Sequence, residues 1–191
     1  WIDCCYQHNP DILSYPDIIA KRARFRLPAL TISFGLCIFS CQNQTSLAAA
    51  IQLILPAFFL LLVTCTDFEQ YVIFDRMLLP FALLALPFLL TNPPTILPHI
   101  EAALAGGLVF LLLAVLLRGA IGGGDIKLIA VLGLWLTQEQ LLQTVMAGFI
   151  LGGLAAFLLM ITKKKGRHDF FAYGPYFALS ALYLLFTSIL S

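Results

Sequence analysis

Two aspartates stand out in an otherwise apolar chain, and they are the side chains best suited to chemistry there. Asp125 follows three consecutive glycines in the stretch Gly122–Leu128, and Asp67 ends an earlier apolar run. A carboxylate beside a membrane-buried helix is costly, by ~2.5–3.5 kcal/mol at a helix centre, so it normally lines a polar cavity or has a partner. Two carboxylates brought close cannot both ionise cheaply, so one keeps a proton while the other can act as a base on water. Such a pair would perform the acid–base hydrolysis that is typical of aspartyl peptidases.

Each acidic residue also has a structural interpretation. Asp125 could cap the helix that follows it, and Asp67 could anchor a helix end at the membrane interface. Asp75 stands next to Arg76, so an ion pair or a helix cap is its default interpretation, and Glu69 is expected to face solvent. Intramembrane carboxylates would serve equally well as the proton or cation site of a transporter. The chemistry therefore depends on whether the fold brings Asp67 and Asp125 together.

The composition is that of an integral membrane protein. Of the 191 residues, 61% are hydrophobic and 11% are charged, against roughly 25% charged in soluble domains, and the mean hydropathy is +0.95. Apolar runs long enough for helical spans recur along the chain, so we predict an all-α, polytopic membrane helical bundle rather than a barrel. The apolar segments lie at about 27–41, 46–65, 77–91, 100–117, 125–137, 140–162 and 170–190. These seven segments predict six to eight spans in the full-length protein, and the first and fifth segments are short for a span.

The positive-inside rule orients the predicted bundle. If residues 1–26 are cytoplasmic, all 11 Lys and Arg residues fall on the cytoplasmic side or at its helix ends. The cytoplasmic loops are then 66–76, 118–124 and 163–169. The opposite loops, which contain no Lys or Arg, are 42–46, 92–99 and 137–140. This topology places Asp67 and Asp125 at the same cytoplasmic level.

The chain divides into a short cytoplasmic N-terminal segment, 1–26, and a membrane-embedded region, 27–191. It opens on Trp1 without a Met, so we expect a piece upstream to be missing. Of five cysteines, Cys4 and Cys5 are adjacent and no C-x-x-C pair occurs. That spacing suits no tetrahedral zinc site, and the three histidines are scattered, so we expect no metal. The net charge of +1 gives no reason to expect nucleic acid as a partner.

Three blocks of the sequence carry a family resemblance. The run Gly122–Gly133 has the pattern G-x-G-D-x-K-L-x-A-x-L-G, and Asp67–Pro80 has a second aspartate eight residues after the first and a proline five beyond that. Tyr173–Leu179 is similar to F-G-P-F-L-A-L, and Arg24–Pro28 resembles a basic, proline-containing entry to a span. In their order along the chain, these blocks resemble those of the type IV prepilin peptidases, membrane aspartyl proteases of the G-x-G-D class. The resemblance covers most of the chain from about residue 24.

The resemblance implies a function and a site. It implies that Asp67 and Asp125 are the catalytic pair. It also implies that Gly122 and Gly124 are motif glycines and that Asp75 and Lys127 are supporting residues. Family members cut the short basic leader from type IV prepilins or pseudopilins, after a glycine, at the cytoplasmic face of the bacterial inner membrane. The resemblance therefore implies an endopeptidase that needs no cofactor for proteolysis.

The chain also departs from the family pattern. Long-form members carry two C-x-x-C pairs, a zinc site, in a cytoplasmic loop, and many methylate the new N-terminus with S-adenosylmethionine. Here that loop is reduced to residues 1–26, with Cys4 and Cys5 adjacent, so the sequence predicts neither zinc nor methylation. Phe74 stands where a proline is usual before the second aspartate, which would alter that turn.

Overall fold

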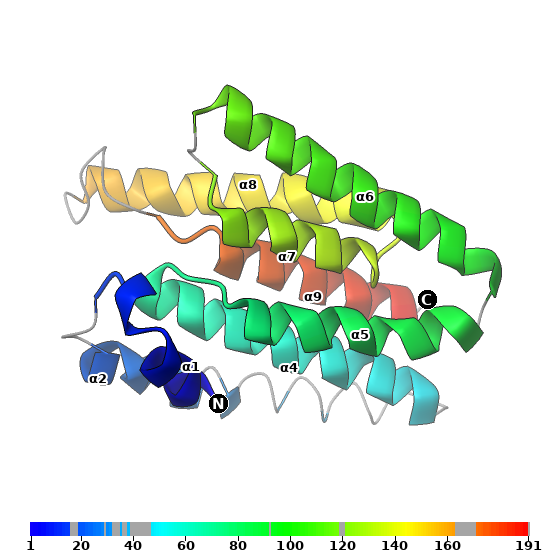
Figure 1. Cartoon of the computed structure of the whole chain (residues 1–191), viewed down its shortest axis with the longest axis horizontal. Helices are drawn as coiled ribbons and strands as arrows, with labels where there is room; N and C mark the ends of the chain where they lie inside the picture. The colour runs from blue at the N-terminus through cyan, green and yellow to red at the C-terminus, as the bar shows by residue number, and fades with distance from the viewer. Residues whose placement is uncertain are drawn as a thin grey trace.

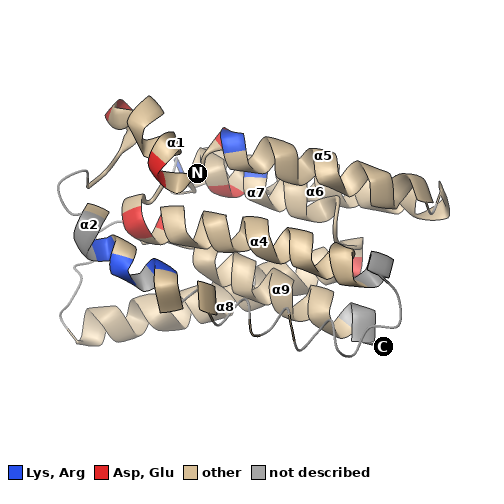
Figure 2. Cartoon of the chain, turned by 90° about the horizontal axis from the view of Figure 1, so that it is seen from below, with Lys and Arg blue, Asp and Glu red and all other residues tan. Residues whose placement is uncertain are grey.

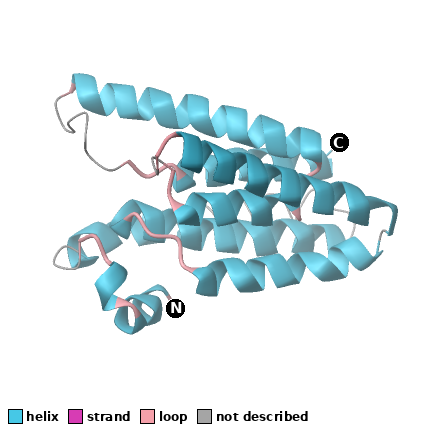
Figure 3. Ribbon diagram, turned by 45° about the horizontal axis from the view of Figure 1, so that its top comes forward, coloured by secondary structure: helices cyan, strands magenta, loops and turns pink. Residues whose placement is uncertain are grey.

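The computed structural model describes residues 1–15, 19–28, 30–31, 35, 38, 47–91, 93–118, 121–162 and 171–190. Regular structure in these ranges is helical, without a strand (Figure 3), which confirms the predicted all-α class. In chain order the helices are α1 Ile2–His8, η1 Pro10–Ile12, α2 Ile19–Arg22, η3 Ala23–Phe25, α4 Leu47–Gln70, α5 Asp75–Thr91, α6 Pro93–Leu116, α7 Gly123–Gly133, α8 Gln138–Ile161 and α9 Gly174–Leu190. The predicted segment 27–41 lies mostly, and the predicted loop 163–169 wholly, outside the described residues.

The long helices pack side by side as a bundle (Figure 1). Three of them have the length and composition to cross a membrane, over Ala50–Gln70, Pro93–Leu116 and Gln138–Ile161, and Gly174–Thr187 is a shorter apolar helix. The most apolar stretch of α4 is 61% buried, against 11% for α6 and 17% for α8, so α4 is the central helix. A helix that is apolar all round and exposed on its outer face suits a lipid environment, which supports the predicted membrane bundle.

The helix α7 ends before the predicted segment 125–137 does. It has 11 residues, which at 1.5 Å per residue is about 16 Å, roughly half of a ~30 Å hydrocarbon core. The chain then turns, with the Leu136 N–H donating to the Leu132 carbonyl at 2.9 Å. Thr137 begins α8 through a capping box with Gln140, which satisfies N–H groups that a helix start leaves unpaired. The fifth predicted segment is therefore too short to span by itself.

The connection between α4 and α5 is shorter than predicted. α4 continues to Gln70, and Tyr71 leaves it with a positive φ of 57°, the left-handed conformation that often ends helices. Only residues 71–74 separate α4 from α5, instead of 66–76. The predicted loop 92–99 is wrong, because α6 already begins at Pro93; proline suits a first helical position, where its missing N–H would be unpaired anyway.

Small residues let the helices approach closely. An added Cβ at Gly107 would lie 3.1 Å from the Ala130 Cβ, so glycine there lets α6 pack against α7. In α8, an added Cβ at Gly152 would meet a tyrosine ring at 2.9 Å, whereas Gly153 has open space around it. Close packing therefore requires glycine at Gly152 and not at Gly153.

An aromatic stack fixes the end of α7 to α5. The Phe81 ring stacks on Phe59 of α4 at 5.4 Å and on Trp135 at 5.5 Å. Trp135 also donates its indole N–H to the Phe81 carbonyl at 3.1 Å. Buried Trp N–H groups need such a partner, so this contact sets how far along the bundle α7 sits, and with it the level of Asp125.

Charged residues gather at one end of the bundle. In Figure 2 the ribbon segments coloured for charged residues lie mainly in α1 and α2, at the end of α4 and where α5 and α7 begin. In Figure 1 the first turns of α5, α7 and α9 lie near one level, alongside the last turns of α4. The polar end of the molecule is therefore where the functional site should be sought.

Candidate functional site

Asp67 lies in the last turn of α4 and is only 6% exposed. Its Oδ2 accepts a hydrogen bond from the backbone N–H of Gly174, the first residue of α9, at 2.9 Å. An added Cβ at Gly174 would lie 2.6 Å from that oxygen, closer than real atoms approach. Only glycine can therefore bring the start of α9 onto the Asp67 carboxyl without displacing it. The block Tyr173–Leu179 thus meets the block Asp67–Pro80 at Asp67.

Asp125 lies in the first turn of α7, and Gly122 occupies the N-cap position instead of Asp125. The Gly122 carbonyl accepts the N–H groups of Asp125 at 3.1 Å and of Ile126 at 3.3 Å. The Asp125 Oδ1 is buried and has no hydrogen-bond partner among the described residues. Buried polar atoms are paired in the great majority of cases, so this oxygen has acceptor capacity that water or a substrate group could use.

The two carboxyl groups belong to one site. The two carboxyl groups lie within electrostatic range of each other, although 58 residues separate them in the sequence (125 − 67). Asp125 lies in the first turn of α7, and Asp67 binds the N–H of the first residue of α9; each helix N-terminus carries about half a positive charge, which favours a nearby carboxylate. Asp67 and one oxygen of Asp125 are nevertheless buried, and two close carboxylates cannot both ionise cheaply. The structure therefore brings the predicted pair together.

The glycines ahead of Asp125 differ in their surroundings. An added Cβ at Gly124 would lie 2.9 Å from the Ile73 Cβ, in the connection between α4 and α5. The same atom at Gly122 would make only an ordinary contact, at 3.4 Å from Asp125 Oδ2, and at Gly123 it would meet nothing within 4 Å. A close approach therefore requires glycine at Gly124, whereas no comparable contact acts on Gly122.

Asp75 and Lys127 form an ion pair outside the buried site. The Lys127 Nζ lies 2.7 Å from Asp75 Oδ1 and 2.8 Å from Oδ2. Both side chains are exposed, at 57% for Lys127 and 69% for Asp75, so the pair links the first turns of α5 and α7 at the surface. The ion-pair interpretation of Asp75 is confirmed, with Lys127 rather than Arg76 as its partner.

A largely apolar cleft of about 330 Å³ opens beside Asp67. Phe68 and Pro175, the residues that follow Asp67 and Gly174, both line it. The remaining walls are Arg22, Tyr71, Leu159, Phe171, Ala172 and Tyr176. The buried carboxyl pair thus has a neighbouring space that an apolar or aromatic side chain would fit.

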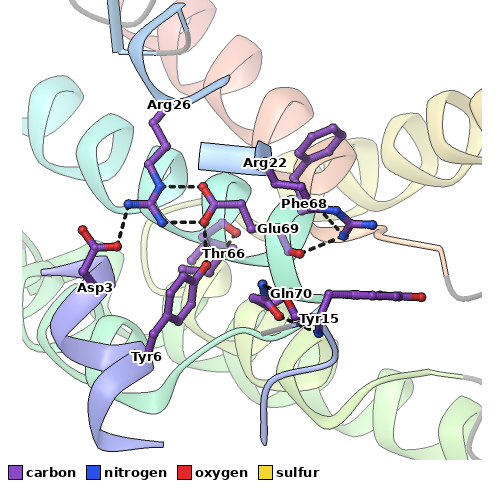
Figure 4. Close-up of polar contacts among 10 residues, drawn as sticks. Asp3, Tyr6, Tyr15, Arg22, Arg26, Thr66, Phe68, Glu69 and Gln70 are labelled. Carbon is purple, nitrogen blue, oxygen red and sulfur yellow. Dashed lines mark hydrogen bonds and ion pairs between the residues drawn. The ribbon is translucent and has the colours of Figure 1, made fainter. Parts of the chain in front are cut away.

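The expectation that Glu69 faces solvent is wrong. Glu69 is 1% exposed and accepts hydrogen bonds from Arg26 through both carboxylate oxygens, at 2.5 Å, and from the Tyr6 hydroxyl at 2.9 Å (Figure 4). Burial and the hydrogen bond to Glu69 raise the pKa of Tyr6, and the hydrogen bonds to Glu69 raise the pKa of Arg26. Both groups therefore remain donors. The partners lie 43 and 63 residues away, so no local pattern could have revealed them.

The described residues contain no group of three or more His, Cys, Asp or Glu that could hold a metal ion. Cys4 is exposed and Cys5 buried, and both are free thiols, while Cys37, Cys41 and His168 lie outside the described residues. The expectation that this chain binds no zinc stays a prediction.

Comparison with known proteins places these features in a family. The sequence profile of the type IV leader peptidase family matches residues 53–157, which include Asp67 and Asp125. The chain is 37% identical over 142 residues to a prepilin leader peptidase/N-methyltransferase of Neisseria gonorrhoeae, a match that covers 71% of this chain and 48% of that protein. The chain therefore spans about half the length of this curated relative. No solved structure matches it.

Proposed function

Because the chain belongs to the type IV leader peptidase family, we propose that it is a prepilin leader peptidase, an aspartyl endopeptidase that removes the leader of type IV prepilins or pseudopilins. One observation carries the proposal. Asp67 and Asp125 come from two separate sequence blocks, yet they share one buried site in which the backbone of a third block binds Asp67. A paired, partly dehydrated set of carboxyls is the arrangement that aspartyl hydrolysis needs.

In the proposed mechanism the pair holds one proton. The ionised carboxylate takes a proton from water while the water oxygen bonds to the scissile carbonyl carbon, and the protonated partner donates to the carbonyl oxygen. The carboxyl that took the proton from water then donates it to the peptide nitrogen. As the C–N bond breaks, one hydroxyl of the gem-diol intermediate gives its proton to the partner carboxylate and the carbonyl re-forms, so the pair again holds one proton. The titration of such coupled groups belongs to the pair rather than to either residue.

The substrate would approach as an extended backbone, because a helical peptide bond is already hydrogen-bonded and harder to attack. The Asp125 Oδ1, buried and unpaired among the described side chains, is placed to bind the attacking water. The cleft beside Asp67 would take an apolar side chain next to the scissile bond. The motif glycines Gly122 and Gly124 would let the Asp125 turn adjust to the substrate.

We propose the bacterial inner membrane as the location, with the site at the cytoplasmic face. The charged end of the bundle (Figure 2) is where α4 ends and α7 begins, so it carries both aspartates, and the positive-inside rule assigns that end to the cytoplasm. Residues 1–26 would then be cytoplasmic and 27–191 membrane-embedded. Cleavage at this rim suits a substrate whose basic leader leaves the membrane where its apolar helix ends.

The proposal covers proteolysis alone. The gonococcal relative is named for a methyltransferase as well, but this chain spans about half of it and shows no C-x-x-C pair. The transporter alternative has no support, because the segment that contains both aspartates matches a peptidase family.

A cleavage assay tests this function. Wild-type protein and the variants Asp67→Asn and Asp125→Asn are placed in membranes with a full-length prepilin, and the N-terminus of the product is sequenced. We expect each variant to abolish cleavage because an amide can neither take nor supply the shared proton, whereas Asp11→Asn, at an exposed position, cuts as the wild type does. Cleavage by Asp67→Asn or Asp125→Asn at the wild-type rate would show that the pair is not catalytic.

A further inference from the structure

The last turn of α4 presents side chains to two different partners. Asp67 points to the start of α9, whereas Glu69 and Gln70 are 1% and 0% exposed and contact residues 1–26 (Figure 4). Residues two apart on a helix lie on nearly opposite faces. Asp67 and Glu69 therefore lie on two sides of one helical turn, whereas Gln70, three residues after Asp67, lies nearer the Asp67 face. A rotation of that turn would move all three side chains.

Glu69 is held by three hydrogen bonds. The Arg26 guanidinium donates from Nε to Oε1 and from Nη2 to Oε2, in the fork geometry that suits a carboxylate, and Tyr6 donates to Oε2. A buried charge is tolerated only when it is paired and its lone pairs are satisfied. Three donors from two separate elements thus fix the position of one side chain of α4.

Two further contacts hold the same turn. The Gln70 side chain pairs with the Tyr15 backbone in both directions, accepting its N–H at 2.8 Å and donating to its carbonyl at 2.9 Å. Arg22 donates to the Glu69 carbonyl at 2.8 Å, one of the carbonyls that a helix end leaves unpaired. A cation there also meets the negative end of the helix dipole.

The contact continues across the connection to α5. The Tyr6 ring lies 5.8 Å from the ring of Phe74, and both residues are buried. Phe74 replaces the proline that is usual before the second aspartate of this family. The neighbouring residue Ile73 is the one against which Gly124 packs, ahead of Asp125. Tyr6 therefore contacts the end of α4 through Glu69 and the end of the α4–α5 connection through Phe74.

We propose that Glu69, held by Arg26 and Tyr6, acts as a positioning residue that fixes the last turn of α4 and orients Asp67 toward Asp125. We call Tyr6, Arg26 and Glu69 the clamp. This inference rests on the proposed function, and it adds a role for Tyr6 and Arg26, which lie outside the matched residues 53–157.

Cleavage kinetics test the positioning role. Arg26→Ala removes both guanidinium bonds to Glu69, and we expect kcat to fall by about 10- to 100-fold, the range for a small misplacement of a catalytic group, with KM within about twofold of wild type because the substrate is still bound. Arg26→Lys, which keeps the charge but not the fork, should recover part of the rate. Tyr6→Phe, which keeps the ring contact to Phe74, should give a smaller loss of kcat and serves if Arg26→Ala does not fold.

Asp3→Asn is the matched control. Asp3 pairs with the same guanidinium at 2.9 Å but is 72% exposed, so its loss should leave kcat at the wild-type value. The proposal is overturned if Arg26→Ala and Tyr6→Phe, assayed as folded protein, keep the kcat of Asp3→Asn. It is equally overturned if a smaller fraction of folded protein accounts for the entire loss of kcat in Arg26→Ala and Tyr6→Phe.

Hydrogen exchange gives a readout that does not depend on activity. The amides of residues 67–71 include the Tyr71 N–H bonded to the Asp67 carbonyl, and we expect their exchange to quicken in Arg26→Ala while exchange in α6 stays unchanged. If wild-type protein cleaves no prepilin, the proposed function fails, yet this exchange still tests the clamp. Unchanged protection at 67–71 in Arg26→Ala would overturn the inference by itself.

Discussion

At the scale of single residues, the Asp67 carboxyl is shaped by a neighbour that carries no side chain. The N–H of Gly174 binds Asp67 Oδ2 at 2.9 Å, and the space beside that glycine is already filled by the same carboxyl. A backbone donor at a helix start is rigid and stabilises negative charge. Gly174 therefore sets both the position and the electrostatics of one half of the pair.

Gly174→Ala should impair cleavage more than folding. Its methyl group would lie 2.6 Å from Asp67 Oδ2, so the carboxyl must move, and a displacement of this kind costs on the order of 100-fold in rate. Overpacking of this kind lowers the free energy of unfolding by about 1–3 kcal/mol. The matched control is Gly153→Ala, which meets open space inside α8 and should be neutral in both assays. Cleavage by Gly174→Ala at the wild-type rate would show that catalysis does not depend on the Asp67 carboxyl position that Gly174 permits.

Asp75→Asn should retain measurable activity. The ion pair to Lys127 is exposed on both sides, and exposed pairs contribute only about 0.2–1 kcal/mol. The variant should therefore keep α5 and α7 in place, with a modest change in rate in the prepilin assay. Loss of cleavage in Asp75→Asn together with activity in Asp67→Asn would move the catalytic assignment to Asp75.

At the scale of elements, the site forms where helix ends meet rather than along one helix. The last turn of α4 supplies Asp67, the first turn of α7 supplies Asp125, and the first residue of α9 supplies the N–H donor. The 11-residue length of α7 and the fixation of Trp135 on α5 hold the start of α7 at this level. Changes at the contact between α7 and the α4–α5 connection should therefore act on catalysis without touching a carboxyl.

Gly124→Ala tests that contact. The added Cβ would lie 2.9 Å from the Ile73 Cβ, so the first turn of α7 must shift away from α4, and Asp125 would move with it. We expect a loss of unfolding free energy of about 1–3 kcal/mol and a clear fall in prepilin cleavage. Gly123→Ala, next to it and in open space, should behave as the wild type. Equal effects of the two substitutions would show that glycine at Gly124 serves another purpose.

At the scale of the whole molecule, charge is distributed unevenly along the bundle. The basic and acidic residues lie mainly at the end where α4 ends and α7 begins (Figure 2), which carries both aspartates, while α6 and α8 expose apolar faces. Such a molecule has one orientation in a membrane if the positive-inside rule holds. The orientation decides whether the aspartate pair faces the cytoplasm, where it would meet a leader peptide before export, or the opposite side, where it would meet the leader after export.

Labelling of single cysteines in intact cells measures the orientation. With the five natural cysteines replaced by serine, we expect Gln138→Cys, exposed at the start of α8, to react with a membrane-impermeant reagent from outside the inner membrane. Lys165→Cys, in the basic loop, should react only after the membrane is opened. Reaction of both from the same side would overturn the topology and the cytoplasmic site.

The helical class and the apolar helices of a membrane protein follow from the sequence alone, which also predicts that Asp67 and Asp125 form a pair. Spanning helices are read from contiguous apolar residues, because each helix satisfies its own backbone hydrogen bonds and buries its surface in lipid. The block around Asp125 is likewise contiguous, so its glycines and Lys127 could be identified as a motif. Helix ends depend on short capping contacts. The helix in the predicted segment 125–137 ends at Gly133, because the Thr137 capping box begins the next helix, α8.

The surroundings of the pair, in contrast, depend on how distant segments pack. Gly174 reaches Asp67 across 107 residues, and Tyr6 and Arg26 reach Glu69 across 63 and 43. A glutamate at a helix end is normally solvated, and burial becomes favourable only when such distant donors converge on it. Nothing in the residues adjacent to Glu69 encodes that convergence, which depends on how residues 1–26 pack against the end of α4.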